Sequence, residues 1–139
     1  MTPIEQRKKI LVVDDDPDIV GYLETVLRDN GYEPLCAMDG TQGLALARQR
    51  KPDLICLDIS MPAPTGVRVY RELRDDPELR SIPVVMVTGV QKEFKEFIHR
   101  RKRVPPPDGY ISKPFEVDEL LATLRRLLTT RPHPVSVDR

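Results

Sequence analysis

The sequence predicts one α/β domain, in which a parallel sheet is covered by helices on both faces. Five short apolar runs of strand length recur along the 139 residues and alternate with stretches whose apolar residues repeat at helical spacing. The strand-like runs are largely continuous in their apolar character, as expected for strands buried on both faces. We find no internal repeat or low-complexity block, so a single domain of ordinary size accounts for the length.

The first strand is predicted at residues 10–13. A helix follows, because Asp16 suits the N-cap, Pro17 the first helical position and Gly31 the helix end. The apolar face of this helix consists of residues at helical spacing: Ile19, Leu23, Val26 and Leu27. The second strand is expected at residues 33–38.

The Asp39-Gly40 pair turns the chain into a second helix with Leu44, Leu46 and Ala47 on its apolar face. This helix ends before Pro52, because a residue that precedes proline disfavours helical geometry. The apolar run 54–57 is the third predicted strand, and it places Asp58 at the point where the strand stops.

The second half of the chain contributes, in order, a rigid loop at 61–66, a helix that ends at 75–77, a strand at 82–87, a helix at 91–102 and a strand at 109–112. Three prolines at 105–107 force a loop before this last strand. The final helix, 117–128, has a strong apolar period that includes Leu120, Leu121 and Leu124. We therefore predict an extension at 1–8, a domain at 9–128 and a tail or linker at 129–139.

Composition narrows the class of protein. With 40% hydrophobic and 32% charged residues, the chain is predicted to be globular rather than disordered or membrane-spanning. The 22 basic and 22 acidic residues cancel, which gives no general case for nucleic acid or an anionic membrane as partner. Cys36 and Cys56 lack metal-type spacing and lie in apolar runs, so we expect buried free thiols. The N-terminus has no apolar signal core, and we expect a cytoplasmic protein.

Polar residues follow the predicted strands: Asp14 and Asp15 the first, Asp58 the third, Thr88 the fourth and Lys113 the fifth. Parallel strands end at one edge of a sheet, so these side chains should converge. Three carboxylates in one crevice repel each other, and Mg²⁺ with its preference for oxygen ligands would relieve that repulsion. Asp15 and Asp58 are the expected direct ligands, with Asp14 acting through a water.

A hydroxyl and an ammonium beside this metal site indicate phosphoryl chemistry. Thr88 could donate a hydrogen bond to one phosphoryl oxygen and Lys113 could pair with another. An aspartate carboxylate is a nucleophile toward phosphoryl groups. We therefore predict that Asp58 accepts the phosphoryl group.

Four ordered motifs carry a resemblance to a known family: Leu-Val-Val-Asp14-Asp15-Asp16, Leu-Asp58-Ile-Ser-Met-Pro, Val-Thr88-Gly and Gly-Tyr110-Ile-Ser-Lys113-Pro-Phe. Together they resemble the receiver domain of bacterial response regulators of the chemotaxis type, over roughly residues 9–128. The resemblance implies a flavodoxin-like, doubly wound sheet with strand order 2-1-3-4-5. It also implies that an acidic pair binds Mg²⁺ and that Asp58 takes phosphate from a histidine kinase or phosphotransfer protein.

Several further roles follow from the resemblance alone. The backbone carbonyl of Ser60 would complete the metal site, the Lys113–Pro114 bond would be cis, and Thr88 and Tyr110 would be the switch residues. The signal would then emerge on the face made by the fourth helix, fifth strand and fifth helix. The chain departs from the family in the loop that ends at Gly66 and in the segment between Thr88 and Tyr110, which contains basic residues at 100–103 and the three prolines.

The leading hypothesis is a phosphorylation-controlled signalling switch, not a turnover enzyme. Two rivals stay open: a binding module that keeps the fold without the chemistry, and a phosphatase of the haloacid-dehalogenase type using Asp14-Asp15-Asp16. The phosphatase would need a further acidic strand end, and only the helix-start residues Glu116, Asp118 and Glu119 follow Lys113.

The expected partners are an upstream kinase or phosphotransfer protein and a downstream protein or output domain outside this sequence. We expect neither membrane nor direct nucleic-acid binding. The sequence leaves open whether the chain stands alone or belongs to a longer protein, and whether it forms a homodimer. The net charge of +4 over residues 91–103 fits a solvated helix face or a docking patch.

Overall fold

The computed structural model describes residues 6–89 and 106–129, and within them five parallel strands form one sheet in the order β2-β1-β3-β4-β5. The strands are β1 (Lys9–Val13), β2 (Glu33–Ala37), β3 (Leu54–Asp58), β4 (Val84–Thr88) and β5 (Gly109–Ser112). This confirms the predicted order and the parallel pairing.

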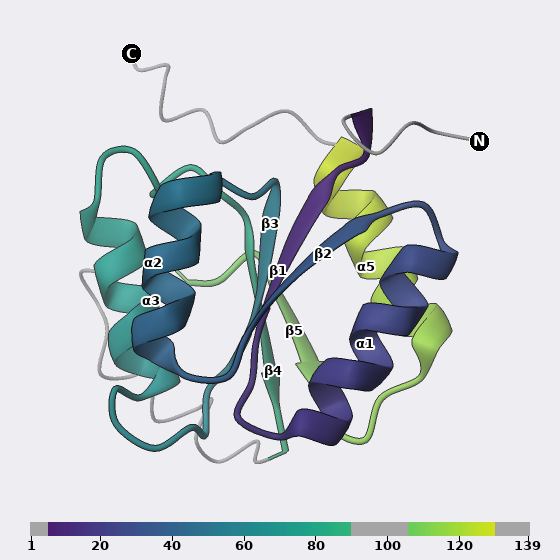
Figure 1. The fold of residues 1–139 in the computed structure, drawn as a ribbon, viewed down its shortest axis with the longest axis horizontal. Helices are drawn as coiled ribbons and strands as arrows, with labels where there is room; N and C mark the ends of the chain where they lie inside the picture. The colour runs from purple at the N-terminus through teal and green to yellow at the C-terminus, as the bar shows by residue number, and fades with distance from the viewer. Residues whose placement is uncertain (1–5, 90–105, 130–139) are drawn as a thin grey trace.

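Four described helices cover the two faces of this sheet. They are α1 (Pro17–Asp29), α2 (Gly40–Arg50), α3 (Gly66–Asp75) and α5 (Val117–Thr129). Figure 1 shows α2 and α3 on one face and α1 and α5 on the other. The helix predicted at 91–102 and its basic residues lie outside the described residues.

Each of the first three helices begins at a side chain that caps it. The Asp16 carboxylate accepts a hydrogen bond from the Asp18 backbone N–H at 2.9 Å, with Pro17 as the first helical residue. The Asp39 carboxylate accepts one from Gln42 at 2.8 Å, and the Thr65 hydroxyl accepts one from Arg68 at 3.2 Å. The predicted starts of α1 and α2 are confirmed.

The core has two halves, one on each face of the sheet. Alternate residues of β1 point to opposite faces, so Leu11 and Val13 pack under α2 and α3 while Ile10 and Val12 pack under α1 and α5. All five residues of β3 are buried. Such a strand requires apolar side chains on both faces, which is why its sequence is a continuous apolar run up to Asp58.

A few predicted boundaries need correction. The fourth strand starts at Val84 rather than Ile82, because Pro83 has no N–H to give to the sheet and the Ile82 carbonyl instead accepts a hydrogen bond from Arg74. Thr129 is the last residue of α5 rather than the first of a tail. Both cysteines are free, but Cys36 is only half-buried.

No described helix is long and apolar enough to cross a membrane. The longest of them, α1 and α5, have 13 residues each. A membrane-spanning helix needs about 20 apolar residues.

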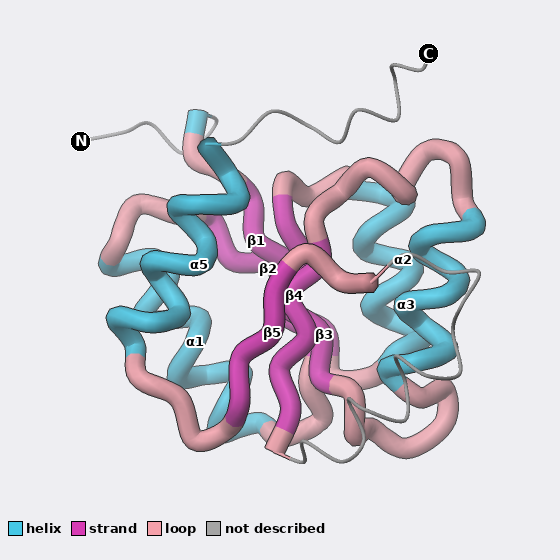
Figure 2. The backbone as a smooth tube through the Cα atoms, turned by 180° about the vertical axis from the view of Figure 1, so that it is seen from behind, coloured by secondary structure: helices cyan, strands magenta, loops and turns pink. Residues whose placement is uncertain are grey.

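All five strands run in one direction, so the sheet has a carboxyl edge, where the strands end, and an amino edge, where they begin. In Figure 2 the strands lie side by side between the two helical layers. The register aligns Asp58 with Val87 and Thr88 with Ser112 at the carboxyl edge. The start of β1 and the end of α5 lie together at the amino edge (Figure 1).

Candidate functional site

Three carboxylates and one ammonium meet at the carboxyl edge, and we call this group the acid pocket: Asp14, Asp15, Asp58 and Lys113. One oxygen from each of the three carboxylates lies within 4.8 Å of the others. Asp14 and Asp58 are each 3% exposed, whereas Asp15 is exposed to solvent. The predicted convergence of these residues is therefore observed.

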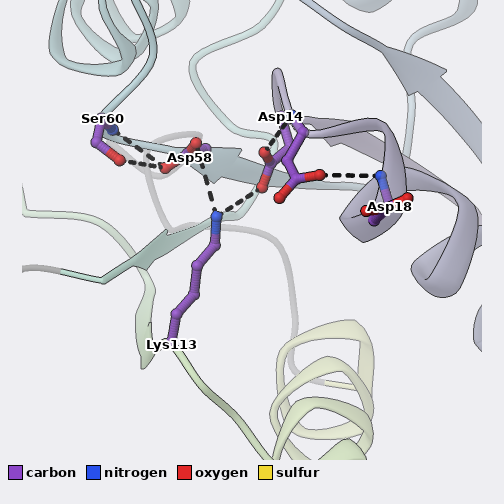
Figure 3. A network of polar contacts seen from close by, with 6 residues as sticks. Asp14, Asp18, Asp58, Ser60 and Lys113 are labelled. Carbon is purple, nitrogen blue, oxygen red and sulfur yellow. Dashed lines mark hydrogen bonds and ion pairs between the residues drawn. The ribbon is translucent and has the colours of Figure 1, made fainter.

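Each buried carboxylate of the acid pocket uses one oxygen locally and turns the other toward the lysine (Figure 3). Asp14 Oδ1 accepts a hydrogen bond from the backbone N–H of Asp16 at 3.0 Å. Asp58 Oδ1 accepts hydrogen bonds from both the backbone N–H of Ser60 at 3.1 Å and its hydroxyl at 3.0 Å. These bonds hold the Oδ2 atoms of Asp14 and Asp58 in place on the side facing Lys113.

Lys113 comes from the loop after β5 and bridges the two buried carboxylates. Its Nζ lies 2.9 Å from Asp14 Oδ2 and 3.7 Å from Asp58 Oδ2. The Lys113–Pro114 peptide bond is cis, as the family resemblance implied. The ammonium thus makes its closer contact with Asp14, although the proposed acceptor is Asp58.

Burial and neighbouring charges both shift the pKa values of the acid pocket. Burial raises the pKa of Asp58; the Ser60 backbone hydrogen bond opposes the rise, the Asp14 charge adds to it and Lys113 opposes it. Burial alone would lower the pKa of Lys113, but its hydrogen bond to Asp14 and the charges of Asp58, Asp14 and Asp16 more than offset this, so the pKa is raised. Within the described residues, the acid pocket holds three carboxylates and one ammonium, so a bound cation would reduce its excess negative charge.

The donor set of the acid pocket suits Mg²⁺. A hard divalent cation takes oxygen ligands and usually keeps several of its waters. Asp14 and Asp58 offer oxygens that are already oriented, and exposed Asp15 lies at the solvent side. The described residues therefore fit the metal that the sequence predicted.

The loop after Asp58 is held against the strand end by glycine. A Cβ atom at Gly66 would collide with the carbonyl oxygen of Asp58, so a side chain at this position would push the loop away. Gly40 makes a similar close approach from α2, where a Cβ would lie 2.6 Å from Val69 and 2.8 Å from Pro64. Although its sequence departs from the family, the loop therefore packs against the end of β3 at Asp58.

The two predicted switch residues lie on the neighbouring strands β4 and β5. Thr88 ends β4 beside Ser112, and its side chain lies outside the described part of the structure. Tyr110 lies on β5 opposite Met86 and is 39% exposed. The next residue, Ile111, belongs to the α1 and α5 half of the core, so Tyr110 points to the face of α3.

A second polar group, which the sequence did not predict, lies at the amino edge. We call it the amino-edge network, and it consists of Tyr70, Arg74 and Asp108. The Arg74 guanidinium lies 2.7 Å from the Asp108 carboxylate and donates a hydrogen bond to the Tyr70 hydroxyl at 3.0 Å. The side chains of Arg74 and Asp108 are 5% and 10% exposed. The sequence did contain one indication of it: Arg74 follows Tyr70 by four residues, so both lie on the core-facing side of α3.

Known proteins are similar to this chain in both sequence and fold. A family model described as the response regulator receiver domain matches residues 10–125. Protein PilH of Pseudomonas aeruginosa is 37% identical over 120 residues, which cover 86% of this chain and 97% of PilH. The DNA-binding dual master transcriptional regulator RpaA of Synechocystis is 40% identical over 123 residues, 86% of this chain but 48% of RpaA.

The chain therefore spans about half the length of RpaA and nearly all of PilH. Among solved structures, the receiver domain of a Pseudomonas aeruginosa sensor histidine kinase superposes with a TM-score of 0.80 at 27% identity. The match covers 89% of this chain and 99% of that one, and that structure holds a magnesium ion coordinated in its active-site cleft.

Proposed function

The chain belongs to the family of response regulator receiver domains, and from this membership and the acid pocket we propose that it is a phosphorylation-dependent switch whose acceptor is Asp58. The observation that carries the proposal is the pair of oriented oxygens on Asp14 and Asp58 around one ammonium. The magnesium ion in the related kinase receiver supports a metal at the same place.

Asp58 Oδ2 is the proposed nucleophile, because Oδ1 is already engaged by Ser60. It attacks phosphorus, a bond from the carboxylate oxygen to phosphorus forms, and the phosphorus–nitrogen bond of a phosphohistidine breaks. The leaving imidazole takes a proton from solvent. Bound Mg²⁺ would supply positive charge to the phosphoryl oxygens.

Lys113 contributes by exchanging partners. Its ammonium pairs with Asp14 before the reaction and lies 3.7 Å from Asp58 Oδ2, close to where the new phosphoryl group would sit. A small movement would let it pair with a phosphoryl oxygen. We propose Thr88 as the hydroxyl partner, Tyr110 as the second switch residue and the Ser60 carbonyl as a further metal ligand, all by analogy with the family.

The partners follow from the same proposal. The phosphodonor would be a sensor histidine kinase or a phosphotransfer protein in the cytoplasm, and the phosphorylated face would bind a downstream protein or an output domain. RpaA is named as DNA-binding, and it is about twice the length of the part matched here. We propose no direct nucleic-acid contact for this chain.

Acetyl phosphate and Mg²⁺, followed by intact mass measurement, test the proposal. The wild type should gain one labile phosphoryl group, and Asp58→Asn should gain none. Asp53→Asn is the matched control: this carboxylate lies just before the same strand and accepts a hydrogen bond from the Lys9 N–H at the amino edge, so the adduct should persist.

Two results would contradict the proposal. No adduct on the wild type would favour a binding module without the chemistry. Repeated hydrolysis that requires Asp14 but not Asp58 would favour a phosphatase.

A further inference from the structure

The amino-edge network is more fully bonded than a surface ion pair. Arg74 Nη1 donates to the carbonyls of Arg80 and Ile82 at 2.8 and 2.9 Å, in addition to the bonds that Nε and Nη2 make to Tyr70 and Asp108. Four of the five N–H donors of a guanidinium are thereby used. The Arg74 guanidinium also lies 4.9 Å from the centre of the Tyr70 ring.

Asp108 ties the start of β5 to the start of β4. The same Asp108 oxygen that pairs with Arg74 accepts a hydrogen bond from the backbone N–H of Val84 at 2.9 Å, and the Asp108 N–H donates to the Val84 carbonyl at 2.9 Å. The position of β5 against β4 is therefore determined by a charged side chain as well as by the strand ladder.

Tyr110 lies two residues beyond Asp108, and side chains two apart on a strand share a face. That face is the one covered by α3, where the Tyr70 hydroxyl accepts its hydrogen bond from Arg74. Burial raises the pKa of the Tyr70 hydroxyl; Arg74 opposes the rise, and Asp108 and Tyr110 add to it. Tyr110 is thus an electrostatic neighbour of the amino-edge network.

We propose that Arg74 is a positioning residue for Tyr110. By clamping Asp108 to α3 and β4, Arg74 holds the start of β5 still, so that Tyr110 can change only by rotating its side chain and not by a shift of the strand. The role of this rotation in signalling rests on the proposed function. The positioning of Tyr110 by Arg74 does not depend on that function.

Fluorine NMR of protein labelled with 3-fluorotyrosine tests the placement. The chain has four tyrosines, so four resonances can be assigned by Tyr→Phe changes. The informative variant is Arg74→Met/Asp108→Asn, which removes both charges together and leaves an amide oxygen to accept the Val84 N–H. We expect the Tyr110 resonance of the unphosphorylated variant to move and broaden, while that of Tyr32, which packs in the other half of the core, stays unchanged.

Arg68→Met is the matched control, since Arg68 is an exposed arginine of the same helix that pairs with Glu72. It should leave the Tyr110 resonance as in the wild type. An unchanged Tyr110 resonance in the folded double variant would overturn the proposal and make the network purely stabilising. Parallel movement of Tyr32 would overturn it too, because that result would mean general loosening.

Beryllofluoride, a phosphoryl analogue, separates this inference from the proposed function. The double variant should still bind it at Asp58 with Mg²⁺, but its Tyr110 resonance should no longer pass between two discrete positions. If the wild type binds no beryllofluoride, the proposed function fails while the result for the unphosphorylated protein still decides the placement. If the variant shows the wild-type pair of positions, the placement fails alone.

Discussion

Both edges of the sheet hold ionised side chains, but the two groups differ in charge balance and in exposure to solvent. At the carboxyl edge, three carboxylates lie together and two of them pair with the ammonium of Lys113, whose side chain is 23% exposed. At the amino edge, one carboxylate meets one guanidinium, both nearly enclosed, and Val84 and two carbonyls complete their hydrogen bonds. The acid pocket is unbalanced and reachable from solvent, whereas the charges of the amino-edge network cancel and most of its hydrogen bonds are made.

This difference teaches how one fold separates reactivity from rigidity. A buried ion pair is tolerated when its hydrogen bonds are complete, and breaking it is strongly destabilising. A cluster with excess negative charge instead favours binding of a cation, which is the role proposed for Mg²⁺ in the acid pocket. Three changes would break or sharpen the comparison.

The largest effect is expected from Arg74→Met. This variant leaves the Asp108 carboxylate buried without its arginine and should lower the free energy of unfolding by about 3–5 kcal/mol, whether or not Mg²⁺ is present. Urea unfolding followed by circular dichroism measures the loss. Arg68→Met should cost about 0–1 kcal/mol, as for other exposed pairs. A loss for Arg74→Met no larger than that of this control would show that the network is not structurally important.

A smaller and conditional effect is expected from Lys113→Met. In EDTA the variant leaves the buried carboxylates of Asp14 and Asp58 without this ammonium and should lose about 1–3 kcal/mol of unfolding free energy. Adding Mg²⁺ should narrow the gap to the wild type, because the more negative pocket binds the cation more tightly. Thermal melts across a Mg²⁺ titration would show this. If the stability difference between the wild type and Lys113→Met stayed constant, Mg²⁺ would not compensate for the loss of the ammonium.

The smallest effect concerns pH. Because burial raises the pKa of Asp58 in the folded protein, the unfolded chain loses this proton first as the pH rises. The contribution of Asp58 to stability should therefore be fully present below the ordinary carboxyl pKa of about 3.9 and should be lost as the pH rises through the folded pKa. The loss is about 1.4 kcal/mol for each pH unit between the unfolded and folded pKa values.

The measurement is the difference between the pH–stability curves of the wild type and Asp58→Asn in EDTA. That difference should grow across this window and then level off, with the variant relatively more stable at neutral pH. Mg²⁺ should abolish it. A difference that runs in the other direction would mean that the Lys113 ammonium, not burial, governs the titration of Asp58.

Much of the fold and the acid pocket could be predicted from the sequence because their signals are local or topological. Asp16 with Pro17, and Asp39 with Gly40, indicate helix starts within a few residues. Asp14, Asp58 and Lys113 are far apart in the chain, yet each follows an apolar strand, and a parallel sheet brings all strand ends together. The predicted parallel fold was therefore sufficient to place these three side chains in one site.

The amino-edge network could not be found this way because its partners obey no common rule. Arg74 lies inside a helix rich in charged residues, and Asp108 follows three prolines in what resembles a turn. The spacing of Arg74 from Tyr70 places both on one side of α3, but only packing shows that the guanidinium meets Asp108, 34 residues later in the chain. The closer contact of Lys113 with Asp14 was equally hidden, since it depends on ångström-scale differences in side-chain reach.

The common location of the first strand's start and the last helix's end also decides how the domain would respond to mechanical tension. The start of β1 and the end of α5 lie at the same edge (Figure 1). Tension between two points at one edge acts across the strands and would peel elements away from that edge. β1 is held by hydrogen-bonded ladders to both β2 and β3, whereas α5 is attached through its apolar face. A stretched chain would release α5 first, and α5 carries none of the acid-pocket residues.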